Sequence, residues 1–156
     1  MSSDVVFGNS AESPLVGHHE ARADFLRAVE QELLSHALLI VGEEGIGKRK
    51  FVEWAVSLLW CSEPSRPCGA CSSCSKVETG NHPDLTVLSK APSEDADPRG
   101  VGSPHEITVG QVRHYVIDVL RLMPAEASCQ AVVIAGADDM NEGAQNALLK
   151  TLEDPP

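Results

Sequence analysis

GEEGIGKR, residues 42–49, matches a phosphate-binding loop in all but one of its parts. Such a loop needs glycines whose backbone N–H groups close around a phosphate, a lysine that reaches the β- and γ-phosphates, and a hydroxyl that holds Mg²⁺. Gly42, Gly45, Gly47 and Lys48 meet the first two requirements. Arg49 stands where the hydroxyl belongs, and a guanidinium has no lone pair for a cation. The sequence therefore predicts a phosphate cradle that lacks one metal ligand.

The segments on both sides of the loop support this interpretation. Residues 36–41 are almost continuously apolar, which predicts a short strand buried on both faces. Apolar residues recur at helical spacing from Phe51 to Leu59, which predicts a helix whose positive end faces an anion. Strand, loop and helix in this order are the context that the motif requires. A glycine-rich surface turn with an exposed lysine is the alternative.

Helices and strands alternate along the rest of the chain. A first helix is predicted over residues 19–34, with an apolar side formed by Phe25, Leu26, Val29 and Leu33. Buried strands are predicted at 84–88 and 131–135. Residues 89–106 are rich in proline, glycine and acids, so we expect a mobile loop there.

Two further helices carry start and stop signals. Thr108 to Gln111 matches a capping box and predicts a helix that ends before Pro124, with a buried stripe of Val109, Val112, Val116 and Val119. Asn141 is expected to cap a last helix that stops at Pro155 and holds Ala144, Ala147, Leu148 and Leu152. This alternation predicts one α/β domain over residues 1–156 with a mostly parallel sheet.

Four of the five cysteines fall within 14 residues, at Cys61, Cys68, Cys71 and Cys74. Four thiolates so close together suit a closed, structural Zn²⁺ site in a module of about residues 61–80. An iron–sulfur cluster and uncoordinated thiols are the alternatives, although residues 75–78 lack the Cys-Pro of the ferredoxin spacing. His82 is a possible substitute ligand, but a turn around Pro83 explains that segment better.

The fifth cysteine, Cys129, precedes an apolar strand, and we expect it to be a small buried hydrophobic residue.

The net charge and the hydropathy of the chain indicate what it binds and where in the cell it is located. Twelve basic residues stand against 23 acidic ones, a net charge of −11, which argues against direct binding to nucleic acid. We therefore expect any DNA contact to come through partners. No run of about 18 apolar residues would span a membrane, and the N-terminus lacks a signal-peptide pattern. The expected location is the cytoplasm.

A second motif of ATP hydrolysis is also displaced. In phosphate-loop ATPases, a second strand ends in acids that hold Mg²⁺ and orient the attacking water. Here Asp138 and Asp139 arrive three residues after the strand at 131–135, about 10 Å further along an extended chain. Together with Arg49, this predicts a nucleotide fold that no longer hydrolyses. A working ATPase or switch that uses Asp138 or Asp139 for Mg²⁺ is the alternative.

Segments along nearly the whole chain resemble the AAA+ clamp-loader subunits of bacterial DNA polymerase III. They are Leu15–His18, His36–Lys48, the cysteine module, His82–Asp84, Ile107–Arg113, Ala137–Asn141 and Asn146–Pro156. The four-cysteine module narrows the resemblance to the gamma/tau and delta-prime branch. Within this branch, Arg49 and the displaced Asp138 and Asp139 favour a resemblance to delta-prime, because gamma/tau relatives keep Lys-Thr and Asp-Glu at these positions.

The resemblance implies a three-layer P-loop (AAA+/RecA-like) domain with an inserted zinc module, whose ligands match Cys61, Cys68, Cys71 and Cys74. It implies a non-hydrolysing jaw in a five-subunit ring with gamma/tau and delta, which loads the sliding clamp onto primer–template DNA in chromosomal replication. Val16 and Gly17 match the segment beside adenine in active relatives. No catalytic residue is expected, because the trans-acting arginine of the family belongs to a Ser-Arg-Cys motif beyond Pro156. An active gamma/tau-type ATPase and a zinc adaptor unrelated to replication are the alternatives.

The resemblance also implies that the chain lacks a central strand. In AAA+ domains, the strand after the last predicted helix inserts between the loop-bearing strand and the acidic strand, and lid and collar domains follow. Without that strand, residues 37–41 and 131–135 would each lose a row of hydrogen bonds. We therefore expect the isolated 156 residues to be poorly stable, or to associate through these strands.

Overall fold

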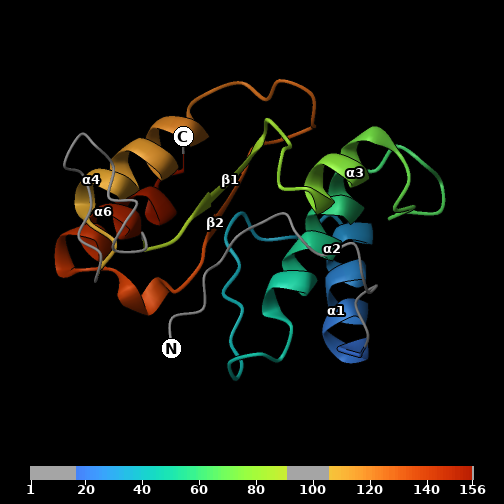
Figure 1. The fold of residues 1–156 in the computed structure, drawn as a ribbon, viewed down its shortest axis with the longest axis horizontal. Coiled ribbons are helices and arrows are strands. Elements are labelled where there is room, and N and C mark those ends of the chain that lie inside the picture. Colours follow the sequence, from blue (N-terminus) through green and yellow to red (C-terminus); the bar gives the residue numbers. More distant parts are fainter. Residues whose placement is uncertain (1–16, 91–105, 156) are drawn as a thin grey trace. The chain divides into compact units, whose positions relative to one another are not determined.

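The computed structural model describes residues 17–90 and 106–155 (Figure 1). These residues form two compact units, one of residues 17–79 and one of residues 80–90 and 106–155. Most of the loop predicted at 89–106 lies outside the described residues. No helix in the described ranges has the length and apolar character needed to cross a membrane.

The unit of residues 17–79 contains three helices, α1 (His19–Glu30), α2 (Lys48–Trp60) and α3 (Ser72–Glu78). Helices α1 and α2 share an aromatic core in which the Phe25 ring lies edge-on to Phe51 and Trp54, with centroids 6.1 and 5.8 Å apart. The Arg22 guanidinium covers the Trp54 ring at 5.0 Å, a cation–π contact. The predicted helix after the glycine loop is therefore confirmed.

Helix α1 ends four residues earlier than predicted. Glu32 adopts a left-handed backbone (φ 57°), and the N–H groups of Glu32 and Leu33 donate to the carbonyls of Val29 and Ala28. These two hydrogen bonds form a Schellman motif, which turns the chain away from the helix axis. Leu33, predicted on the buried side, is 72% exposed as a result. The motif lacks its usual glycine, so it could not be predicted from the residue types.

The prediction of a strand at residues 36–41 is wrong. This segment pairs with no strand of the described residues, and Leu39 and Val41 are 83% and 82% exposed. A strand exists only through hydrogen bonds to a neighbour, and in the described ranges β1 and β2 form the only sheet. The segment is apolar, as its sequence indicates, but its burial would need a neighbouring strand, which the local sequence does not supply.

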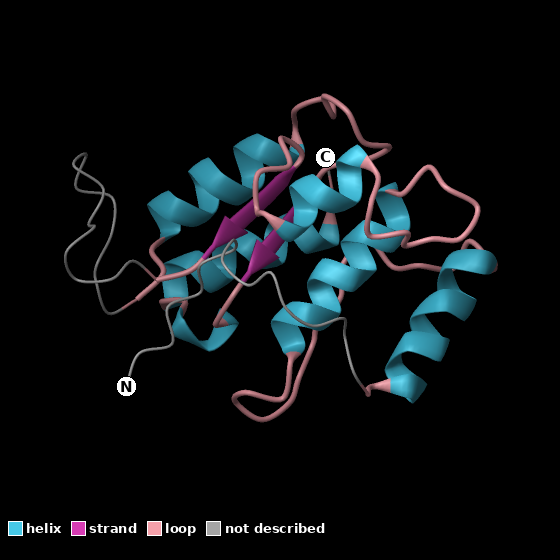
Figure 2. Cartoon of the chain, turned by 45° about the vertical axis from the view of Figure 1, so that its right-hand side comes forward, coloured by secondary structure: helices cyan, strands magenta, loops and turns pink. Residues whose placement is uncertain are grey.

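The other unit contains a parallel pair of strands, β1 (Leu85–Leu88) and β2 (Ala131–Ile134), drawn side by side in Figure 2. Leu85 lies opposite Ala131 and Leu88 opposite Ile134. Both predicted strands and their parallel direction are thus confirmed. Strand β2 is half-buried along its length rather than buried, in keeping with a sheet of two strands.

A continuous helical segment covers residues 109–120 and packs against the sheet. It consists of α4 (Val109–Val112), a π-helical turn η1 (Arg113–Ile117) and α5 (Asp118–Leu120). The predicted capping box is confirmed, because Thr108 Oγ1 accepts from the Gln111 N–H at 3.4 Å and Gln111 Oε1 accepts from the Thr108 N–H at 2.8 Å. The π turn was not predicted.

Helix α6 (Glu142–Glu153) follows a short 3₁₀ turn, η2 (Ala137–Asp139), and begins at the predicted residue. Asn141 Oδ1 accepts from the Ala144 N–H at 2.9 Å. Helices α4 and α6 contact each other, and the buried core of this unit comprises Leu88, Ile107, Val112, Val116, Met140 and Ala144. Leu152, predicted on the apolar side of this helix, is 39% exposed.

A buried carboxylate joins the start of β1 to the loop that precedes β2. Asp84 is fully buried, and its two oxygens accept from the backbone N–H groups of Ala125, Glu126 and Ala127 at 2.6, 2.8 and 2.7 Å. The Gln130 side chain adds a fourth hydrogen bond at 3.2 Å. Burial raises the pKa of Asp84, but the three N–H donors outweigh it, so this pKa lies below its ordinary value.

Cys129 lies in the same loop and is exposed, so the prediction of a buried Cys129 is wrong. The backbone of this loop closes around the Asp84 carboxylate, and that long-range contact sets which side chains face solvent.

We expect Asp84→Asn to destabilise the complete protein by about 3 kcal/mol, because an amide presents N–H groups to buried N–H donors. Chemical denaturation at pH 7 would measure this loss. Since the pKa of Asp84 is lowered on folding, its contribution is present above the ordinary pKa of 3.8 and disappears as the pH falls below it. A difference between wild type and variant that persisted unchanged at low pH would contradict this account.

Candidate phosphate loop and candidate metal centre

The glycine loop turns directly into the first turn of α2, as the motif requires. Gly47 precedes the helix with a left-handed backbone (φ 99°), which residues with a side chain rarely adopt. A Cβ at Gly42 would lie 3.2 Å from Ile46 Cγ2, so the loop folds closely on itself there. Backbone conformation at Gly47 and the limited space at Gly42 thus favour glycine at both positions.

The Lys48 ammonium lies within this loop. Its Nζ donates to the carbonyl oxygens of Gly42 and Glu43 at 2.7 and 2.8 Å. The cation that would reach a phosphate is therefore held by the loop's own backbone.

Arg49, at the position of the missing hydroxyl, points its charge along the helix. Its Nε donates to Glu53 Oε1 at 3.0 Å, and Lys50 Nζ lies 3.0 Å from Glu53 Oε2. Glu53 is 8% exposed and had no role in the sequence analysis. The spacing of four residues from Arg49 was the available signal, because such pairs meet on one helix face.

His18 also contacts the loop. Its Nε2 lies 2.7 Å from the Ile46 carbonyl oxygen, and it precedes α1 with a left-handed backbone (φ 53°). Of the two residues predicted on the adenine side, Gly17 directly precedes His18, whereas Val16 lies outside the described residues.

A hollow of about 470 Å³ adjoins the loop within this unit. Its lining is mostly apolar and comes from α1, the segment before the loop, the loop and α2. Lys48, His18 and Asp24 supply its polar groups.

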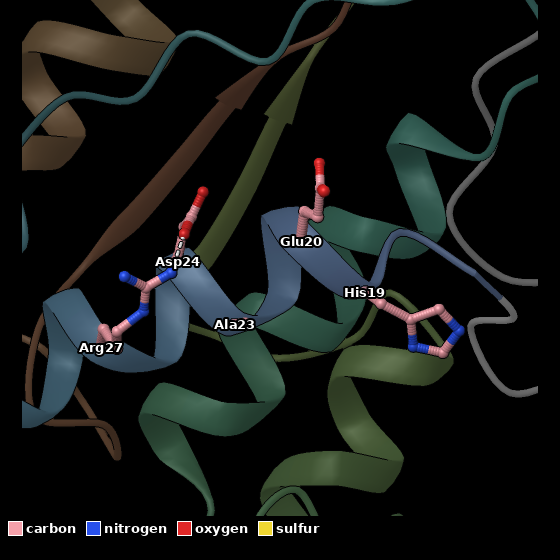
Figure 3. Close-up of a pocket in the computed structure, with 5 residues that line it drawn as sticks. All are labelled: His19, Glu20, Ala23, Asp24 and Arg27. Carbon is pink, nitrogen blue, oxygen red and sulfur yellow. Dashed lines mark hydrogen bonds and ion pairs between the residues drawn. The ribbon is translucent and has the colours of Figure 1, made fainter.

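A second hollow lies along α1 and is lined by residues of that helix alone. Figure 3 shows its lining residues, which all come from this one helix: His19, Glu20, Ala23, Asp24 and Arg27. Asp24 and Arg27 pair with each other, and the His19 ring points to another side (Figure 3). This arrangement is a solvated helix face.

Asp138 and Asp139, the acidic residues that follow β2 after a gap, belong to the other unit, in η2 after Gly136. Asp139 Oδ1 lies 3.3 Å from Lys90 Nζ, and the Asp139 carbonyl accepts from the Ile107 N–H at 2.8 Å. Gly136 has a left-handed backbone (φ 76°), which favours glycine in this turn. The Asp139 carboxylate is therefore engaged by a cation of its own unit.

The four clustered cysteines converge as predicted. Their Sγ atoms all lie within 4.8 Å of one another, so these residues can hold a metal ion. Cys61 follows the end of α2, Cys68 and Cys71 lie in the loop before α3, and Cys74 lies in α3. A tetrahedral zinc–thiolate site would place its sulfurs about 3.8 Å apart, and the Cys61 and Cys71 sulfurs are 3.9 Å apart.

The surroundings of the sulfurs shift the pKa values of two of these thiols in opposite directions. The Cys71 N–H donates to Cys68 Sγ at 3.3 Å, and the Ala70 N–H does so at 3.5 Å. A backbone hydrogen bond from Cys74 lowers the pKa of Cys71 to about 7, whereas burial raises the pKa of Cys74 to about 12. One thiol thus ionises readily, and the thiolate is the form that binds metal.

His82 has a different partner. Its Nδ1 accepts from the Asp84 N–H at 3.2 Å, within the turn that leads into β1. The metal-binding group found in the described residues consists of cysteines alone.

These features define a mixed α/β protein with a short parallel sheet and a four-cysteine centre. Residues 17–156 match the family model described as "DNA polymerase III, delta subunit", and the chain belongs to this family.

The relatives include two delta' subunits and a tau subunit of DNA polymerase III. The delta' subunit of Pseudomonas aeruginosa is 40% identical over 124 residues, which cover 78% of this chain and 34% of that protein. The delta' subunit of Escherichia coli is 33% identical over 123 residues, with the same coverage. The tau subunit of Bacillus subtilis is 26% identical over 144 residues, 91% of this chain and 23% of that protein. The chain thus spans about a third of the length of these delta' relatives.

We expect the purified protein to be colourless and to carry one zinc ion per chain. Cys74→Ser should lose the metal, because it removes the most buried of the four sulfurs, and Cys129→Ser should retain it. Elemental analysis by mass spectrometry measures the metal content of all three proteins. A brown protein that contains iron and sulfide would contradict the zinc assignment.

Proposed function

We propose that the chain acts as a non-hydrolysing subunit of the clamp loader, a structural jaw in the ring that loads the sliding clamp onto primed DNA during chromosomal replication. The observation that carries this proposal is the environment of Arg49. At the position of the Mg²⁺-binding hydroxyl, a guanidinium is held by Glu53 at 3.0 Å. Phosphoryl transfer depends on a correctly held metal ion.

The environment of Asp139, one of the two displaced acidic residues, supports the same proposal. Asp139 is paired with Lys90, in a unit separate from the loop. A carboxylate that already balances a lysine is a poor candidate for Mg²⁺. In this proposal Gly42, Gly45, Gly47 and Lys48 remain as a degenerate cradle with no catalytic group, and gamma/tau subunits supply the ATP turnover of the ring.

The remaining parts of the proposal follow from composition and likeness. Relatives named delta' and tau support gamma/tau and delta as ring partners. The net charge of −11 supports contact with primer–template DNA and the clamp through the complex. Structural Zn²⁺ is the proposed ion at the four cysteines, because it favours four thiolates in a closed site. The proposed location is the replisome in the bacterial cytoplasm.

A second candidate is a nucleotide-binding switch or an active ATPase. It is favoured by the intact glycines and by a lysine already within the loop. Its weakness is the lack of a metal ligand.

Native mass spectrometry of the complete subunit, mixed with gamma/tau and delta from the same host, tests the proposal. We expect one copy of the chain in a five-subunit ring, with one zinc ion and no nucleotide on this subunit. A chain that stays outside the ring and carries Mg²⁺-nucleotide would shift the function to the second candidate.

We expect the complete subunit alone to show no ATP turnover above background, because neither metal ligand is in place. Lys48→Ala should therefore change nothing in a phosphate-release assay. Turnover by the wild type that is abolished in Lys48→Ala would establish an ATPase, and Asp138→Asn and Asp139→Asn would then identify its metal ligand.

A further inference from the structure

We propose that Gly69 is a positioning residue of the four-cysteine centre, because its left-handed backbone places the Cys68 sulfur among the other three. Gly69 binds no metal itself, but it determines how tightly the centre binds one. The inference rests on the zinc ion that the proposed function assigns to these cysteines, and it requires nothing of ATP hydrolysis or of the clamp.

Three of the four cysteines belong to a helix or to its cap. Cys61 is the residue at which α2 ends, and its N–H donates to the Ser57 carbonyl at 2.9 Å. Cys71 is the N-cap of α3, where its carbonyl accepts from the Ser75 N–H at 3.0 Å, and Cys74 lies within α3. Helices α2 and α3 contact each other. The packing of these two helices therefore holds three of the four ligands.

Cys68 is the exception, because it lies in the loop between α2 and α3, outside both helices and their caps. Its sulfur accepts two backbone hydrogen bonds instead, from the Cys71 N–H at 3.3 Å and from the Ala70 N–H at 3.5 Å. Since Cys71 caps α3, these hydrogen bonds tie the Cys68 sulfur to the start of that helix. The position of the fourth ligand therefore depends on the local turn rather than on helix packing.

Gly69 allows this turn to form. Its φ of 70° lies in the left-handed region, which residues with a side chain rarely adopt. Successive backbone N–H groups beside a left-handed residue form a concave site for a negative charge, and here the charge is that of the Cys68 thiolate. A Cβ at Gly69 would meet no atom within 4 Å. Backbone conformation, and not lack of space, is therefore what favours glycine at this position.

A different residue at position 69 should weaken the binding of metal. A closed zinc site uses all four thiolates. With alanine at position 69, the left-handed backbone costs free energy, so the metal-free loop relaxes and loses the two hydrogen bonds to Cys68. Metal binding must then restore the turn. Changes to groups that orient metal ligands typically cost about 10- to 100-fold in affinity.

The experiment measures the zinc affinity of the complete subunit by competition with a chromophoric chelator under reducing conditions. We expect Gly69→Ala to bind zinc about tenfold more weakly than wild type. Gly69→Asn should recover most of this loss, because asparagine adopts the left-handed backbone more readily than alanine does. Gly136→Ala changes a glycine of the same backbone region (φ 76°) in the other unit, and it should bind zinc like wild type.

A double substitution tests whether Gly69 acts through Cys68. Cys68→Ser removes the sulfur that the turn places, so adding Gly69→Ala to Cys68→Ser should cause no further loss of zinc affinity. A tenfold loss in this background as well would mean that Gly69 acts on the fold in general, and it would overturn the inference.

The other outcomes are equally decisive. A Gly69→Ala protein that binds zinc like wild type overturns the inference, and so does a Gly69→Asn protein that binds as weakly as Gly69→Ala. If Gly69→Ala does not fold, Gly69→Asn decides: affinity close to that of wild type supports the role of the backbone, and a tenfold loss overturns it. A wild-type protein that binds no zinc would refute the proposed metal together with this inference, whereas the assembly of the ring tests the proposed function separately.

Discussion

The unit of residues 80–90 and 106–155 depends on the contacts of the Asp84 carboxylate. A charge with no exposed surface is tolerated only when several donors surround it, and here three consecutive backbone N–H groups and one amide do so. In return, the carboxylate satisfies a loop that has no regular secondary structure. The start of β1 and the approach to β2 are thereby fixed together, and the parallel register follows, with the Ala131 N–H donating to the Asp84 carbonyl at 2.9 Å.

Charged side chains of the candidate site are also paired with groups of the chain itself. At the start of α2, Glu53 holds Arg49 and Lys50, and the carbonyls of Gly42 and Glu43 hold Lys48. Lys90 does the same for Asp139 in the other unit. Each of these charged side chains therefore has a partner within its own unit.

Local signals were sufficient where a motif carries the residue types that are typical of it. The cap of α6 by Asn141 and the capping box at Thr108 each depend on a neighbour three residues away, and both were predicted from the sequence. The cysteine cluster belongs with them, because α2, one loop and α3 bring its ligands together over a short stretch. The short apolar runs of residues 84–88 and 131–135 likewise identified β1 and β2.

The failures share a different cause, since in each a side chain depends on contacts that hydropathy does not encode. Leu33 was placed by periodicity on α1, yet a left-handed Glu32 ends the helix before it. Cys129 has the residue type of a core position, but the Asp84 contact fixes its loop with that side chain exposed. Residues 36–41 have the composition of a buried strand and lack a strand partner. Glu53 was missed for the converse reason: a carboxylate on a helix is usually solvated, and here it is buried because two cations come to it.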